Sequence, residues 1–62
     1  MNVEVINQTT GRILASIMTN HSMSVDDVIN LMGWTVGETG EVLVESTGKP
    51  VGADYEELEL VY

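Results

Sequence analysis

Apolar residues between Val25 and Met32 recur with the period of an amphipathic helix. Ser24 precedes this stretch, and Asp27 comes three residues after Ser24, which is the spacing of a capping box at a helix start. Gly33 is a typical helix stop, because glycine readily adopts the left-handed conformation. The pattern predicts a helix over residues 25–32 with one face in the core. The apolar stripe consists of Val25, Val28, Ile29 and Met32, with Leu31 widening it.

Four other stretches are rich in residues that favour β-strands. A Thr-Gly turn follows the first and the third of them, and a cation follows each turn: Arg12 after Gly11, and Lys49 after Gly48. A three-residue hairpin loop with a bulge needs a positive φ at its glycine. The sequence therefore predicts two hairpins built alike. The four predicted strands are residues 2–7, 12–19, 41–45 and 58–62.

Two segments between these strands are less regular. Residues 35–40 contain two glycines and are predicted to form a loop, with Trp34 and Val36 tucked beneath its edge. Pro50 lacks an amide donor and so belongs at a strand edge or start. The return arm of the second hairpin is therefore expected to be short, with a β segment at Val51.

The C-terminal residues allow two interpretations. Asp54 and Glu57 have capping-box spacing, which predicts a single helical turn before the chain enters the last strand. The alternative is a longer helix, because short apolar runs are ambiguous by period alone. Its apolar face would consist of Tyr55, Leu58, Val61 and Tyr62.

Together these elements predict an α+β fold, with one small antiparallel sheet of two β-hairpins packed on a central helix. The expected order is β-β-α-β-β, in a single domain spanning residues 1–62. The strand at 12–19 carries apolar residues on both faces, so it belongs in the middle of a sheet or has one face covered by another subunit. A homodimer that buries Leu14 or Met18 follows from the second option. The two faces are Ile13, Ala15 and Ile17 on one side and Leu14, Ser16 and Met18 on the other.

Composition restricts the partners of the chain. Ten acidic residues against two cations give a formal net charge of −8 in 62 residues. Direct nucleic-acid and membrane binding are disfavoured, because both depend mainly on Lys and Arg. A partner with a basic surface would instead be attracted. The chain has no cysteine, so a core this small is expected to gain stability from oligomerisation or a partner, and the cytoplasm is the expected compartment.

No set of residues has the pattern of an active site. His21 is the only histidine and has no evident companion for acid–base or nucleophilic chemistry. The acidic C-terminal residues lack the spacing of an EF-hand loop, and the glycines match no nucleotide-binding motif. Arg12 and Lys49 are expected either to form a small cationic patch or to pair with Glu4 and Glu45. We therefore expect a non-enzymatic protein with no cofactor or metal site.

The sequence is most consistent with a small acidic protein-interaction module, acting alone or as a homodimer. The alternative is an acidic inhibitor that mimics nucleic acid and blocks a basic site on a target protein. A mimic needs its carboxylates on one continuous face, whereas a general module would scatter them. The paired Thr-Gly turns and the Leu-Glu-Leu-Val-Tyr ending resemble those of short proteins from bacterial or phage genomes. The candidate protein-binding residues are Leu14, Met18, Asp54, Tyr55, Glu56, Glu57, Glu59 and Tyr62.

Overall fold

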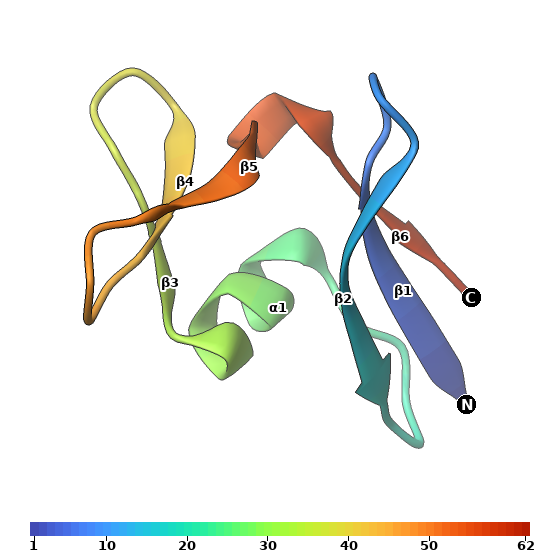
Figure 1. Cartoon of the computed structure of the whole chain (residues 1–62). Coiled ribbons are helices and arrows are strands. Elements are labelled where there is room, and N and C mark those ends of the chain that lie inside the picture. Colours follow the sequence, from blue (N-terminus) through green and yellow to red (C-terminus); the bar gives the residue numbers. More distant parts are fainter.

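The computed structural model describes all residues, 1–62, and has an α+β architecture with one helix between two three-stranded antiparallel sheets (Figure 1). The prediction of a single sheet was therefore wrong. In chain order the elements are β1 (Asn2–Asn7), β2 (Arg12–Met18), α1 (Val25–Met32), β3 (Trp34–Val36), β4 (Glu41–Val44), β5 (Pro50–Asp54), the 3₁₀ turn η1 (Tyr55–Glu57) and β6 (Leu58–Val61).

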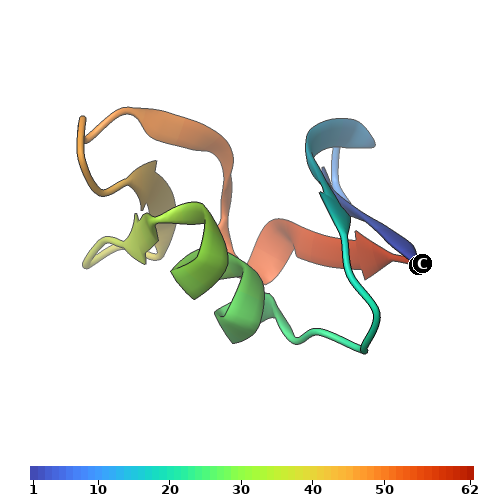
Figure 2. The same cartoon turned by 90° about the horizontal axis from the view of Figure 1, so that it is seen from below.

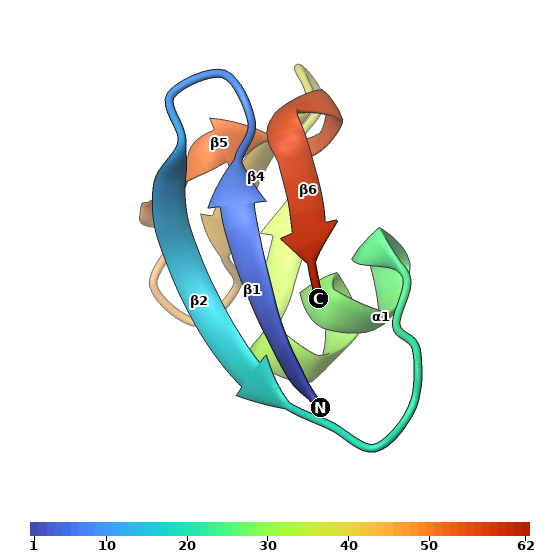
Figure 3. The same ribbon diagram turned by 90° about the vertical axis from the view of Figure 1, so that its right-hand side faces the viewer.

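The first sheet has the strand order β2-β1-β6, and the second has the order β3-β4-β5. The chain passes from one sheet to the other at η1, which redirects it from β5 to the far side of β1 (Figures 1 and 3). The chain leaves the first sheet after β2 and enters the second through α1, so the two sheets are separate before η1. The turn adds β6 to the first sheet, where it pairs with β1 instead of extending the second hairpin. The short turn and the terminal strand agree with the first C-terminal interpretation, and the longer helix was wrong.

The helix α1 has the predicted bounds and the predicted ends. Ser24 is its N-cap, the Ser24 hydroxyl accepts from the Asp27 amide at 3.1 Å, and the Asp27 carboxylate accepts from the Ser24 amide. Gly33 ends the helix in the left-handed conformation, with φ 71°. The apolar stripe is narrower than predicted, since Leu31 and Met32 are 62% and 39% exposed and do not belong to the core.

The two predicted Thr-Gly turns have the same geometry. The φ angles of Gly11 and Gly48 are 75° and 71°. In each turn the glycine amide donates to a carbonyl oxygen four residues earlier at 2.7 Å, and the threonine hydroxyl accepts from the amide of the following cation at 3.3 Å. The prediction of two hairpin turns built alike is confirmed.

Strand β2 differs from its prediction because of a bulge. The pairing with β1 shifts between Val5 opposite Ala15 and Ile6 opposite Ile13, so that Leu14 has no partner. Leu14 therefore packs against the core on the same side as Ala15, while Ile13 is turned outward and is 57% exposed. The strand also lies at an edge of its sheet, not in the middle.

The hydrophobic core lies between the two sheets and is closed on one side by α1 (Figure 2). Trp34, which was expected near a loop, is buried here because β3 pairs with β4 and holds its side chain inward. The eight buried residues of the core are Val5, Ile17, Val28, Ile29, Trp34, Val42, Ala53 and Leu58. No helix is long and apolar enough to cross a membrane.

Candidate functional site

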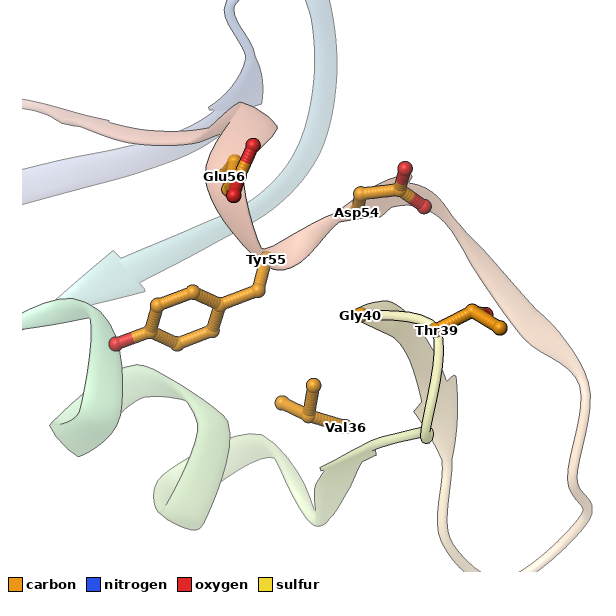
Figure 4. Close-up of a pocket in the computed structure, with 6 residues that line it drawn as sticks. All are labelled: Val36, Thr39, Gly40, Asp54, Tyr55 and Glu56. Atoms are coloured by element: carbon orange, nitrogen blue, oxygen red, sulfur yellow. The ribbon is translucent and has the colours of Figure 1, made fainter.

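A partly open pocket of about 280 Å³ lies where η1 meets the turn between β3 and β4 (Figure 4). The Tyr55 ring and the Val36 side chain lie on opposite sides of it, and the Asp54 and Glu56 side chains project outward on either side of Tyr55. Three of the candidate protein-binding residues therefore lie together at one pocket. Its six lining residues are Val36, Thr39, Gly40, Asp54, Tyr55 and Glu56.

Two hydrogen bonds hold Tyr55 in place, one from its backbone and one from its side chain. Its backbone amide donates to the Gly40 carbonyl oxygen at 2.7 Å, and its hydroxyl donates to the Asp26 carboxylate at 2.9 Å. The hydrogen bond and the negative charge of Asp26 raise the pKa of the Tyr55 hydroxyl, so the phenol stays protonated and neutral at physiological pH. The ring is thus fixed between the β3–β4 turn and the start of α1.

The Glu57 carboxylate forms hydrogen bonds with residues of its own turn and of the first hairpin turn. Its carboxylate accepts from the Asp54 amide at 3.0 Å, as the predicted capping-box spacing requires. This backbone hydrogen bond makes the largest contribution to lowering the pKa of Glu57, side-chain hydrogen bonds from Thr9 and Asn7 add to it, and desolvation opposes it. Glu57 therefore stays ionised and stabilises the turn that carries Tyr55.

Asn7 is a buried polar residue that links the two sheets, and the sequence analysis did not identify it. Its Nδ2 donates to the Gly52 carbonyl oxygen in β5 at 3.0 Å, while its Oδ1 accepts from the amides of Thr9 and Thr10. The neighbouring Gln8 donates through its amide to the Glu57 carbonyl oxygen at 2.8 Å. The first hairpin turn therefore supports both β5 and η1.

The remaining candidate residues lie away from the pocket. Leu14 packs against the core, and Met18 is 78% exposed at the end of β2. Glu59 lies opposite Ile6, on the outer face of the first sheet. The Tyr62 hydroxyl donates to the Met23 carbonyl oxygen at 2.7 Å and accepts from the Met23 amide, so it ties the C-terminus to the segment before α1.

The carboxylates are spread over several surfaces of the molecule. Glu41 lies opposite Asp54 in the β4–β5 pairing, near the pocket. Glu4 and Glu59 both face outward from the first sheet, because the residues beside them in β1 and β6 point into the core. No group of three or more potential ligands is placed to hold a metal ion.

The two cations and the histidine do not form a site. Arg12 and Lys49 follow turns of different sheets, and the β1–β2 hairpin and the β4–β5 hairpin lie on opposite sides of the view in Figure 1. The expected pairing of Glu4 with Arg12 was wrong, because the bulged register places Ser16 opposite Glu4 and Asn7 opposite Arg12. His21 is exposed, and its Nδ1 lies 2.9 Å from the carbonyl oxygen of Ser22.

The sequence analysis identified one side of the pocket and missed the other. The run of acids around Tyr55 was a sufficient signal for residues 54–56. Val36 and Gly40 were interpreted only as loop residues, and Asp26 was not identified as a contact of Tyr55. Comparison of the chain with protein families, with curated proteins and with solved structures found no match.

Proposed function

We propose that this chain is a small acidic interaction module without enzymatic activity, which binds a basic surface of a partner protein. The contact is the face formed by η1 and the β3–β4 turn. The observation that carries the proposal is the pocket between Val36 and Tyr55, with Asp54 and Glu56 beside it. The lack of cysteine suits a reducing compartment, so we also propose that the protein acts in the cytoplasm.

Electrostatics favours this class of partner. A unit charge placed about 4 Å from a carboxylate is attracted by about 1 kcal/mol in water. The two carboxylates beside the pocket act together with Glu41 and Asp26, within a molecule of net charge −8. Such a surface accelerates association with a basic partner, and added salt weakens the attraction because the Debye length is about 8 Å at 0.15 M.

The alternative, an acidic inhibitor that mimics nucleic acid, requires a continuous row of carboxylates. Here Glu4 and Glu59 face outward from the first sheet, whereas Asp54 and Glu56 lie beside the pocket near the second. This separation supports a module with one local binding face over a mimic of a long phosphate backbone. Both readings predict a basic partner, and they differ in how many acids contribute to binding.

The test is an NMR titration with an octapeptide of alternating serine and lysine. We expect amide shifts confined to residues 36–40 and 54–56. The double variant Asp54→Asn with Glu56→Gln should bind about twofold to thirtyfold more weakly, because each exposed charge pair contributes roughly 0.2–1 kcal/mol.

The matched control is Glu4→Gln with Glu59→Gln, which removes the same charge from the outer face of the first sheet. We expect this control to change the affinity by less than about twofold. Equal loss in both double variants would favour the mimic, because every carboxylate would then contribute. Absence of binding at low salt would contradict both readings.

A further inference from the structure

The pocket is small and partly open. Its volume of about 280 Å³ falls below the range of roughly 300–1,000 Å³ that is usual for small-molecule sites. It is also shallow, because Val36 and Tyr55 remain 40% and 38% exposed. An occupant therefore enters from a partner and covers these two apolar surfaces.

The walls and the rim of the pocket differ in chemistry. Val36 and the Tyr55 ring offer apolar surface along its length, and the hydrogen bond from Tyr55 to Asp26 fixes the ring before any ligand arrives. Asp54 and Glu56 provide negative charge only at the rim, where their side chains point outward (Figure 4). The complementary side chain is apolar along its stem and cationic at its end.

Lysine and arginine have this form, because their methylene stems pack on apolar surface while the charged end stays at the water boundary. A cation close to the face of the Tyr55 ring would gain a further electrostatic attraction from the ring. A purely apolar side chain would cover part of the rim without pairing the carboxylates, and burying unpaired charge is costly. An acidic side chain would be repelled.

We propose that the pocket is the binding site for a single lysine or arginine side chain of the partner. The methylene stem of that side chain lies between Val36 and the Tyr55 ring, and its charge lies beside Asp54 and Glu56. This inference rests on the proposed function and adds to it that the stem, as well as the charge, is recognised. Attraction by the acidic surface alone would depend on charge and not on the length of the side chain.

Four octapeptides that alternate serine with one test residue separate these two contributions. The test residues are lysine, arginine, norleucine, which keeps the lysine stem without the charge, and diaminopropionate, which keeps an ammonium on a short stem. We expect lysine and arginine to bind with similar affinity, diaminopropionate to bind about fivefold more weakly, and norleucine to show no saturable binding.

The wall is tested with Tyr55→Ala and Tyr55→Phe. Tyr55→Ala should weaken the lysine peptide about fivefold and leave the diaminopropionate peptide within about twofold, while Tyr55→Phe, which keeps the ring, should retain most of the lysine affinity. The one-dimensional proton spectrum verifies that both variants are folded. Equal affinity for the lysine and diaminopropionate peptides would contradict the proposal that the pocket binds a lysine or arginine side chain, but not the proposal of a basic partner. Failure of all four peptides to bind would contradict the proposed function itself.

Discussion

Replacing Asn7 by alanine should weaken the whole fold, although the residue lies next to a surface turn. Asn7 is only 4% exposed and is the one buried polar residue of the chain. Its side chain makes three hydrogen bonds with backbone groups, to the Gly52 carbonyl oxygen at 3.0 Å and from the amides of Thr9 and Thr10 at 2.9 and 3.3 Å. Alanine removes all three and leaves the link between the two sheets without its central side chain.

The magnitude follows from these three bonds. A typical hydrogen bond contributes about 1 kcal/mol net, and an acceptor left without a partner costs about 1–3 kcal/mol. Thr9, Thr10 and Gly52 are exposed residues, so water replaces part of what is lost. We therefore expect a loss of about 2–4 kcal/mol. The total stability expected of a chain this short is about 3–9 kcal/mol, so the variant should be close to unfolding.

Urea denaturation followed by Trp34 fluorescence measures this loss, because Trp34 is buried in the core. With a slope of about 1 kcal/mol per molar urea, the midpoint should fall by about 2–4 M. The matched control is Asn2→Ala, an exposed asparagine on the same strand, which should change stability by less than about 0.5 kcal/mol. A loss of under 0.5 kcal/mol in Asn7→Ala would refute the argument that this side chain holds the sheets together.

Four further predictions concern the cap, a turn, pH and association. Ser24→Ala removes the hydroxyl that caps α1 and should lower the free energy of unfolding by about 0.5–2 kcal/mol, whereas an unchanged urea midpoint would contradict the cap. Gly48→Ala should cost more than about 0.5 kcal/mol, because the backbone there has φ 71°. The hydrogen bond from the Asp54 amide lowers the pKa of Glu57 in the folded state. The ionised Glu57 therefore contributes its full stabilisation at pH values above its pKa in the unfolded chain, and this stabilisation is lost as the pH falls through its pKa in the folded state. The stability difference between the wild type and Glu57→Gln should accordingly be present at neutral pH and close below the usual glutamate pKa of 4.5. Any self-association should involve the outer face near Met18 and tighten with salt, and sedimentation equilibrium at two ionic strengths should then show a larger species at the higher one.

The helix and the hairpin turns could be predicted because short-range chemistry determines them. The Ser24–Asp27 capping box and the left-handed Gly33 act within a few residues, so the helix has the predicted bounds. The same holds for Gly11 and Gly48, where local hydrogen bonds and the tolerance of glycine for positive φ are sufficient. These features need no information about distant parts of the chain.

The sheets and the pocket depend on long-range pairing, which a local pattern cannot determine. The bulge that turns Leu14 inward and Ile13 outward arises from the register between β1 and β2, and a shift of one residue exchanges the faces of a strand. The two hairpins form separate sheets because neither β1 nor β2 pairs with a strand of the second hairpin, and β6 returns to pair with β1. The pocket exists because η1 meets the β3–β4 turn through the hydrogen bond from the Tyr55 amide to Gly40, while the bond from the Tyr55 hydroxyl to Asp26 of α1 fixes the ring. Acidic residues around Tyr55 were visible in the sequence, but the apolar wall opposite them was supplied by tertiary contacts between segments far apart in the chain.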